Sequence, residues 1–279
     1  MSRMLYVCPT PIGNLEDITL RVLRVLQEVD LILAEDTRHS GQLLHHFQIS
    51  KPLESLHEHN EKEKTKRIID LLHGGQKIAL ISDAGMPGIS DPGAWLIKEV
   101  IDQGLPLEVL PGANAALVAY LQSGFLTPHF LFYGFLPRRS KERKQTLEEL
   151  KIVPFPIIFY EAPHRLLAML DDLYAVFGDR LVSISRELTK RFEETKRGTL
   201  AELIKIYREQ GPRGEFVITI AGAPSQTARE ITEGDILATL QNLISSGLSR
   251  KTAINQVSSE YRLPKNLVYE LALKLKSED

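Results

Sequence analysis

The sequence predicts an α/β protein with two consecutive α/β domains and a small C-terminal helical extension. Short apolar runs alternate with helical patterns from the first residues, which is typical of βαβ units and a parallel sheet. The alternation pauses around residues 124–130 and then begins again. Because 279 residues fit two domains of ordinary size and an appendage, we expect domains at 1–120, 121–225 and 226–279.

The first domain is expected to contain strands at the apolar runs MLYVC, LILAE, KIALI and LEVL. Between the first two runs, apolar residues recur every three or four positions, which indicates an amphipathic helix; these residues are Ile18, Val22, Val25 and Val29. Further helices are expected at TKRIIDLLH, AWLIKEVID and NAALVAYLQS. The pattern therefore predicts strands joined by helices.

The second domain repeats the pattern, with strands expected at LFYGFL, PIIFYEA, LVSISREL and EFVITIAG. Helices are expected near residues 141–150, 164–177 and 199–210. Beyond AGAPSQTARE the strand patterns stop, and SRKTAINQVSSEY and PKNLVYELALKLK predict a final pair of helices. Pro264 suits the first turn of the last helix, because the N–H that proline lacks has no partner there.

The composition is that of an ordinary globular protein, with 43% hydrophobic and 25% charged residues. No apolar run approaches the roughly 18 residues of a membrane span, so we expect a cytoplasmic protein with no membrane segment. The single cysteine, Cys8, lies in an apolar run and is expected to be a buried thiol in a reducing compartment. The formal net charge of -2 gives no general attraction to nucleic acid.

Two local segments are nevertheless basic. Residues 138–144 carry five positive charges and one negative charge, and residues 249–276 carry six and two, so each segment has a net charge of +4. A solvated helix face explains either segment alone about as well as an RNA contact does. In the second segment, cations spread along both helices suit RNA phosphates or packing in a dimer equally; they include Arg250, Lys251, Arg262 and Lys265.

Three expected strands are followed by loops rich in glycine, alanine and proline: PTPIGNLED, SDAGMPGISDPG and LPGANAA. Ligands of open α/β sheets bind at the carboxyl ends of strands, and small residues let main-chain groups approach a ligand closely. A tight turn explains one such loop, but three of them favour a ligand site. The motifs G-x-G-x-x-G and G-x-x-x-x-G-K-[ST] are absent, which argues against a dinucleotide or P-loop site.

Charged residues follow two other strands. Glu35, Asp36 and Arg38 come directly after LILA, where Asp36 is either a catalytic carboxylate or the N-cap of the next helix. Arg38 either holds a phosphate or pairs with Glu35. The motif SRELTK supplies Glu187 and Lys190 as a second acid–base pair. Lys190 would act as a base only if its surroundings lowered its pKa.

A metal site is not expected. The clusters His45-His46 and His57-Glu58-His59 invite one, but no H-E-x-x-H motif or cysteine cluster accompanies them. A structural or surface role is the stronger interpretation of these histidines.

The motifs VCPTPIGNLEDIT, LILAEDTRHS, HEHNE, ISDAGMPGISDPG, LPGANAA, FYEAPHR, SRELTK and GEFVITIAG follow one another along the chain. In these motifs and their order, the chain resembles the ribosomal RNA methyltransferase branch of the tetrapyrrole methylase superfamily over nearly its whole length. The resemblance implies a homodimeric class III methyltransferase with S-adenosylmethionine in a cleft between the two α/β domains. It also implies methylation of a cytidine ribose 2'-hydroxyl in the decoding region of 16S ribosomal RNA, either free or in the small subunit.

Site residues follow from the resemblance together with the loops. The expected cofactor contacts are Pro11, Asp83, Ala84, Gly85, Ile89, Pro111, Gly112, Ala113 and Tyr160. The catalytic candidates are Glu35, Asp36, Arg38, Glu187 and Lys190, with Asp36 orienting the ribose and Arg38 its phosphate. Tyr160 flanks the adenine or belongs to the core, and Asp91 belongs to the site or caps the helix that begins near Gly93.

Two other functions remain open. The same fold and cofactor can act on a tetrapyrrole or another small molecule, but two separate basic segments argue against this substrate. An RNA-binding assembly factor without catalysis would have no physical reason to keep three glycine-rich loops at strand ends.

Overall fold

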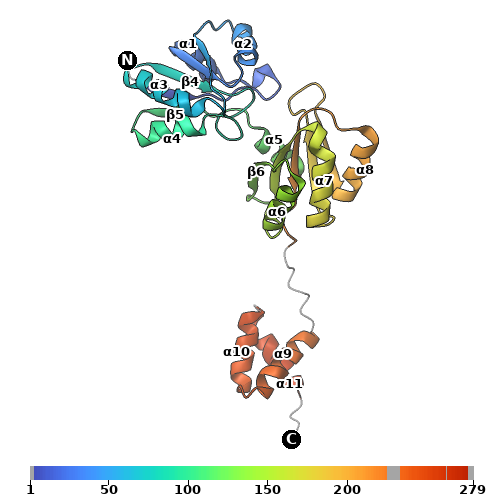
Figure 1. Cartoon of the computed structure of the whole chain (residues 1–279). Helices are drawn as coiled ribbons and strands as arrows, with labels where there is room; N and C mark the ends of the chain where they lie inside the picture. Colours follow the sequence, from blue (N-terminus) through green and yellow to red (C-terminus); the bar gives the residue numbers. More distant parts are fainter. Residues whose placement is uncertain (1–2, 225–232, 262, 276–279) are drawn as a thin grey trace. The chain divides into compact units, whose positions relative to one another are not determined.

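The computed structural model describes residues 3–224, 233–261 and 263–275. The chain divides into two compact units, Met1–Gly222 and Ala223–Asp279. The first unit contains two five-stranded sheets, and the second consists of helices in the residues that the structure describes (Figure 1).

The first sheet is entirely parallel, as expected, with the strand order β3-β2-β4-β1-β5. Its strands are β1 (Met4–Val7), β2 (Leu31–Ala34), β3 (Leu53–Ser55), β4 (Lys77–Ile81) and β5 (Leu107–Val109). The connections contain the short η1 (Leu15–Asp17) and the helices α1 (Leu20–Glu28), α2 (Thr37–His46), α3 (Glu61–His73) and α4 (Ala94–Asp102). The sequence did not reveal β3, because this strand has only three residues and none of them is fully buried.

Both faces of the first sheet are covered by apolar side chains. Leu33 and Leu80 belong to one buried cluster, whereas Ile32 and Ile81 belong to another. This division follows from the alternation of side chains along a strand. Cys8 lies in the second cluster with no exposed surface, and burial raises the pKa of its thiol to about 12, which confirms the expected buried thiol.

The second sheet is mixed, with the strand order β6-β7-β10-β8-β9. Its strands are β6 (Leu131–Phe135), β7 (Ile157–Glu161), β8 (Leu181–Arg186), β9 (Glu194–Thr199) and β10 (Phe216–Ile220). Only β6 and β7 pair in parallel, so the expected parallel pairing is wrong for the rest of this sheet. A short loop joins β8 to β9, and such a connection can join only antiparallel neighbours. The sequence did not reveal β9, a largely polar strand at the sheet edge.

The second sheet packs against α5 (Ala115–Ser123), α6 (Ser140–Leu150), α7 (Pro163–Phe177) and α8 (Leu200–Gln210). Residue 120, where the first domain was expected to end, lies within α5. Ala116, Ala119 and Tyr120 of this helix share a buried cluster with Ile158 and Val217 of the second sheet.

The second unit contains α9 (Glu233–Ser245), α10 (Arg250–Glu260) and α11 (Lys265–Lys274). Its separate core includes Leu240, Val257 and Leu271. Ser249 caps α10 by accepting a hydrogen bond from the Thr252 N–H at 3.2 Å. Arg262 and Lys276 of the basic segment 249–276 lie outside the described residues. In the part of the chain that the structure describes, none of the helices is long and apolar enough to cross a membrane.

Candidate active site

A cavity of about 400 Å³ lies in the first unit, at the strand ends of both sheets. Its lining comes from the loops after β1, β4 and β5 and from the ends of β6, β7 and β8 with the start of β10. Glu161, Phe216 and Arg186 are neighbours in the register of β7, β10 and β8, so these three strand ends lie side by side. The volume suits a small ligand.

Six of the residues expected from the sequence line this cavity: Ala84, Gly85, Ile89, Tyr160, Glu187 and Lys190. The others are not part of its lining: Pro11, Asp83, Pro111, Gly112, Ala113, Glu35, Asp36 and Arg38. Three of these, Pro11, Asp83 and Ala113, directly precede residues that do line the cavity.

The three glycine-rich loops lie close together, and two of them are joined through their main chains. Thr10 and Gly85 exchange two backbone hydrogen bonds, of 2.9 and 3.0 Å. Gly85 has a φ of 80°, a conformation that side chains disfavour. A Cβ atom on Gly112 would lie 2.7 Å from the Pro9 Cβ atom. The glycines therefore permit the close approach of these loops.

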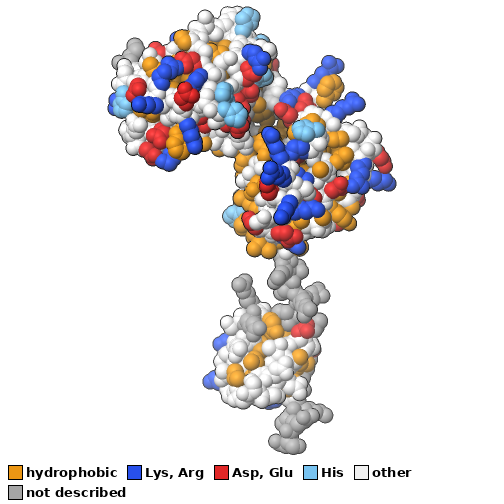
Figure 2. Space-filling view, in the orientation of Figure 1, with side chains coloured by type: hydrophobic (Ala, Val, Ile, Leu, Met, Phe, Trp, Pro, Cys, Tyr) orange, Lys and Arg blue, Asp and Glu red, His pale blue; other side chains and the backbone are white. Residues whose placement is uncertain are grey.

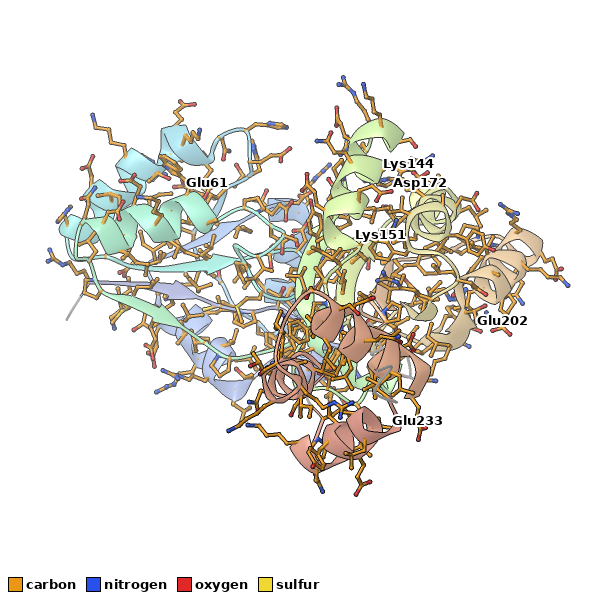
Figure 3. All side chains as sticks on the ribbon, turned by 90° about the horizontal axis from the view of Figure 1, so that it is seen from below. Glu61, Lys144, Lys151, Asp172, Glu202 and Glu233 are labelled. Atoms are coloured by element: carbon orange, nitrogen blue, oxygen red, sulfur yellow. The ribbon has the colours of Figure 1, made fainter. Side chains whose placement is uncertain are left out.

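The end of the loop SDAGMPGISDPG is held by a carboxylate from another helix. Glu61 at the start of α3, labelled in Figure 3, accepts hydrogen bonds from the N–H groups of Gly93, Trp95 and Leu96 at 2.9 to 3.1 Å. Glu61 thus caps α4 in place of a local side chain. Asp91 makes no capping bond to this helix and lines the cavity instead.

Acidic side chains gather beside this loop. Burial, followed by the charge of Asp83, raises the pKa of Asp91 to about 6. Burial, followed by the charges of Asp91 and Asp83, raises the pKa of Glu35 to about 7. Both carboxyl groups therefore change protonation near neutral pH, as a general base does. Among the described residues, no three His, Cys, Asp or Glu side chains are arranged to hold a metal ion.

Asp36 and Arg38 form a local pair at the start of α2. The Asp36 carboxylate caps the helix by accepting a hydrogen bond from the Arg38 N–H at 2.8 Å, and it accepts a second from the Arg38 guanidinium at 2.9 Å. These bonds lower the pKa of Asp36 to about 2. Arg38 pairs with Asp36 and not with Glu35, and its side chain is 89% exposed. Asp83 accepts a 3.2 Å hydrogen bond from the Asp36 N–H, which ties this turn to the loop after β4.

The wall from the second sheet consists of charged and aromatic side chains. The Lys190 ammonium lies 3.1 Å from Glu187 and 2.7 Å from Glu215. Burial lowers the pKa of Lys190, but its hydrogen bonds to Glu215 and Glu187 outweigh burial and raise the pKa above its ordinary value. Lys190 is therefore a cation and does not meet the condition for a base. Beside it, burial raises the pKa of Tyr160 to about 12, and its ring packs 5.6 Å from that of Phe135.

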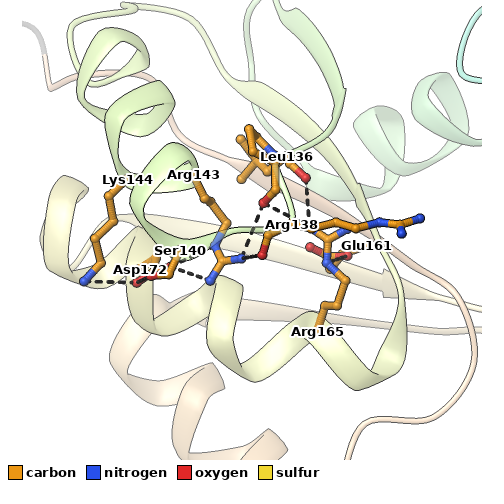
Figure 4. A network of polar contacts seen from close by, with 9 residues as sticks. Leu136, Arg138, Ser140, Arg143, Lys144, Glu161, Arg165 and Asp172 are labelled. Carbon is orange, nitrogen blue, oxygen red and sulfur yellow. Dashed lines mark hydrogen bonds and ion pairs between the residues drawn. The ribbon is translucent and has the colours of Figure 1, made fainter.

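Most cations of the basic segment 138–144 are engaged within the protein (Figure 4). Arg143 is 5% exposed, donates to the Asp172 carboxylate at 2.8 Å and also donates to the Arg138 carbonyl. Lys144 pairs with the same aspartate, and Arg139 pairs with Glu142. Of this segment, only Arg138 and Lys141 lack a carboxylate partner among the described residues. Fewer cations of this segment are therefore available to bind RNA than its net charge of +4 suggests.

The cavity lining carries an excess of negative charge. Its carboxylates are Asp91, Glu161, Glu187 and Glu215, and Lys190 is its only lysine or arginine among the described residues. Glu161 pairs with Arg165 at 3.2 Å, so the excess comes from the other three carboxylates against one lysine. Such a lining attracts a positively charged ligand.

Sequence reasoning missed several lining residues, among them Asn114, Phe135 and Glu215. Phe135 ends a strand parallel to β7, so the strand-end rule applied to the first sheet would have found it. Glu215 precedes β10, whose antiparallel direction no local pattern reveals. Glu61 lies in the motif HEHNE, but its role depends on a helix some 30 residues away.

Comparison with known proteins identifies relatives of this chain. Residues 4–204 match the model of the tetrapyrrole (corrin/porphyrin) methylases. A protein named ribosomal RNA small subunit methyltransferase I from Halalkalibacterium halodurans is 47% identical over 96% of this chain and 93% of its own length. The protein of the same name from Synechocystis sp. is 44% identical over 99% of each chain.

Among solved structures, a uroporphyrin-III C-methyltransferase from Thermus thermophilus, in complex with S-adenosylhomocysteine, has a similar fold. The TM-score is 0.58 at 15% identity, and the match covers 77% of this chain and 96% of that chain.

Proposed function

Because this chain belongs to the tetrapyrrole methylase family, we propose that it transfers a methyl group from S-adenosylmethionine to the 2'-hydroxyl of a cytidine in 16S ribosomal RNA. The observation that carries this proposal is the identity of 44 to 47% over 96 to 99% of the chain with relatives named as small-subunit ribosomal RNA methyltransferases. The nucleotide, in the decoding region, is the one that the sequence motifs indicated.

The extent of the similarities favours RNA over a tetrapyrrole as the substrate. The family model ends at residue 204, before the helical unit begins at Ala223. The ribosomal RNA methyltransferase relatives, by contrast, match almost the whole chain. A flat macrocycle gives no physical reason for an additional helical unit with exposed Lys251 and Lys265.

The cavity fits S-adenosylmethionine, which supplies a methyl group bonded to a positively charged sulfur. Its acidic lining suits this charge, and the small residues Ala84 and Gly85 allow main-chain contacts with the ligand. Ile89 and Tyr160 supply the apolar part of the wall. The remaining proposed cofactor residues lie in the same three loops, outside the cavity lining: Pro11, Asp83, Pro111, Gly112 and Ala113.

Asp91 is the proposed general base. It lines the cavity, whereas Glu35 and Asp36 do not. Bound in this cavity, S-adenosylmethionine would supply the methyl group to the ribose oxygen, and the electron pair of the broken carbon–sulfur bond would remain on sulfur. The hydroxyl proton passes to the Asp91 carboxylate. A pKa of about 6 leaves this group mostly ionised at neutral pH yet basic enough to accept a proton.

The other proposed catalytic residues orient the substrates. The Arg38 guanidinium is paired with Asp36 but its side chain is 89% exposed, so it is the proposed contact for an RNA phosphate, with Asp36 holding it at the start of α2. Glu187 and Lys190 shape the opposite wall as an ion pair. Glu35 lies in the electrostatic range of Asp91 and raises the negative potential beside it.

A homodimer is the proposed assembly, and the ribosomal substrate implies a cytoplasmic protein. Helix α5 is apolar on two sides: Ala119 packs against the second sheet, whereas Leu117 and Leu121 are exposed on the other side. A second copy of the chain would cover this exposed face. Light scattering of the full chain should give twice the mass of one chain, and the mass of a monomer would contradict the dimer.

The test compares three substrates with labelled S-adenosylmethionine: assembled small subunits, free 16S RNA and a porphyrin precursor. We expect label in RNA, at the ribose of one cytidine, and none in the porphyrin. Label in the porphyrin alone would support the tetrapyrrole alternative. Binding of RNA without transfer to any substrate would support a non-catalytic assembly factor.

A further inference from the structure

We propose that the loop at residues 187–193, between β8 and β9, is an RNA-contact element in which the Phe192 ring stacks on an unpaired base and Arg191 binds a phosphate. This inference rests on the proposed function. It assigns substrate recognition to residues that no sequence motif singled out.

The loop begins in the cavity wall and ends outside it. Glu187, Leu188 and Lys190 line the cavity, whereas Arg191 and Phe192 are not part of its lining and are exposed. In Figure 1 the loop between β8 and β9 projects from the second sheet, and Figure 2 shows basic and hydrophobic side chains together on this part of the molecule. An RNA segment whose ribose entered the cavity would pass this loop.

The loop backbone is held in an uncommon conformation. Glu187 and Thr189 have φ values of 51° and 65°, which cost free energy in residues with side chains and persist only when the surroundings impose them. The Thr189 N–H donates to the Glu193 carboxylate at 2.6 Å. The Thr189 hydroxyl accepts a 3.1 Å hydrogen bond from the Asn14 N–H of the loop after β1.

The anchoring continues on both sides of the tip. The Gln122 amide of α5 donates to Glu193 at 2.6 Å, and Lys190 pairs with Glu187 and Glu215. A loop ordered before binding loses little conformational entropy when RNA binds. The exposed tip is thus preorganised, which is the condition for specific contact with a flexible single strand.

The side chains at the tip suit single-stranded RNA. Phe192 is 67% exposed, and the Arg191 guanidinium lies 5.6 Å from the centre of its ring. The neighbouring cations Arg186 and Lys196 share one carboxylate partner, Glu194. Arg191, in contrast, has no carboxylate partner among the described residues. An exposed aromatic ring beside an unpaired arginine provides a stacking surface and a phosphate contact together.

The test uses the full-length protein with Phe192→Ala, Phe192→Tyr and Arg191→Ala. The matched control is Phe155→Ala, because Phe155 is also an exposed aromatic residue. It precedes the start of β7, so it lies at the end of the strands opposite to the loop 187–193. Three quantities are measured: KM for small subunits, Kd for S-adenosylmethionine by calorimetry, and Kd for an RNA oligonucleotide of the decoding region by filter binding.

Phe192→Ala should raise KM for subunits and Kd for RNA by about 10-fold to 100-fold, as expected from the loss of one stacked base. Its Kd for the cofactor should stay within about twofold of the wild type, since the ring lies outside the cavity. Phe192→Tyr keeps an aromatic face and should restore RNA binding, and Phe155→Ala should match the wild type. Arg191→Ala should weaken RNA binding and reduce its dependence on salt.

Unchanged RNA binding in Phe192→Ala, with normal methyl transfer by the wild type, would overturn this inference and leave the proposed function intact. Dissociation of a dimer by Phe192→Ala would overturn it in favour of a contact with a second copy of the chain. Absence of transfer by the wild type would instead refute the proposed function, and the RNA oligonucleotide would still report on the loop.

Discussion

The wall that the first sheet contributes to the cavity is built of glycine-rich loops, whereas the wall of the second sheet is built of charged and aromatic side chains. The loops after β1 and β4 contact each other through backbone hydrogen bonds between Thr10 and Gly85. The opposite wall depends on the ion pairs of Lys190. The wall of the first sheet should therefore be sensitive to substitutions that add side-chain atoms to its glycines. The wall of the second sheet should be sensitive to substitutions that remove side-chain atoms.

Asp91 is the exception in the first wall, since its proposed role depends on a side chain. Asp91→Asn should lower kcat by about 10²-fold to 10⁴-fold, the usual loss for a general base. The cofactor Kd should change little. In the wild type, kcat should rise with pH through about 6, because the carboxyl group accepts a proton only when ionised. Steady-state kinetics between pH 5 and about 8 measure both effects.

Asp36→Asn is the matched rival for this role. The Asp36 pKa of about 2 makes this group a weak base, and its side chain does not line the cavity. We expect a smaller loss of kcat than in Asp91→Asn. If Asp36→Asn abolished transfer while Asp91→Asn remained active, the general base would be Asp36 and the first wall would be assigned incorrectly.

The second sheet is covered by helices that share a buried ion pair, Arg143 with Asp172, which lies outside the cavity lining. Arg143→Ala leaves Asp172 buried without its main partner beside the loop that follows β6. Its free energy of unfolding should fall by about 3 to 5 kcal/mol, the usual effect of breaking a buried ion pair. Lys144→Ala removes the exposed partner of the same aspartate and should cost less than about 1 kcal/mol. Equal decreases in the free energy of unfolding of the two variants, measured in urea, would show that the buried Arg143 stabilises the protein no more than the exposed Lys144 does.

The first wall also depends on one remote side chain, Glu61. Glu61→Ala leaves three N–H groups at the start of α4 without their acceptor. The free energy of unfolding should fall by about 2 to 3 kcal/mol, and cofactor binding should weaken because the loop before α4 loosens. Glu63→Ala on the exposed side of α3 is the control and should match the wild type. Unchanged cofactor affinity in Glu61→Ala would show that capping of α4 by Glu61 does not affect the cavity.

The smallest expected effect comes from one added carbon. Gly85→Ala puts a Cβ atom at a φ of 80° and 3.3 Å from the Ile12 side chain. The free loop should relax to relieve strain of about 1 to 2 kcal/mol, and restoring it on binding raises the cofactor Kd by about fivefold to 30-fold. Gly75→Ala, at a φ of 96° with open space around it, should cost stability alone. Calorimetry measures the effect of each variant on cofactor affinity, and thermal unfolding measures its effect on stability. Equal cofactor affinities of the two variants would contradict the proposal that the loop at Gly85 contacts the cofactor through its main chain.

Local sequence patterns predicted most of the strands and helices. The runs KIALI and FVITI are strands because apolar and β-branched residues suit a buried strand on both faces. Capping residues acted equally locally, as in Asp36 and Ser249, each of which caps the helix that follows it. Polar or very short strands escaped detection, as β9 and β3 show, because they form by pairing with a neighbouring strand that lies elsewhere in the sequence.

Candidate site residues were predictable to the extent that strand ends determine them. Ala84, Gly85 and Ile89 follow β4 directly, and they line the cavity. Glu215 was not predictable, because the direction of β10 depends on pairing with β7 and β8. The predicted RNA-binding charge of residues 138–144 was overestimated, since nothing local indicates that Arg143 is buried against Asp172.

Local sequence specifies where most strands end and where small residues let the main chain approach a ligand, because both depend on residues adjacent in the chain. Tertiary structure alone decided the chemistry of the individual side chains. Glu61 caps α4 and leaves Asp91 in the cavity, and Glu215 keeps Lys190 protonated. These outcomes depend on partners that folding brings together from distant parts of the chain, and a pKa or a hydrogen bond reflects such partners and not the neighbours in sequence.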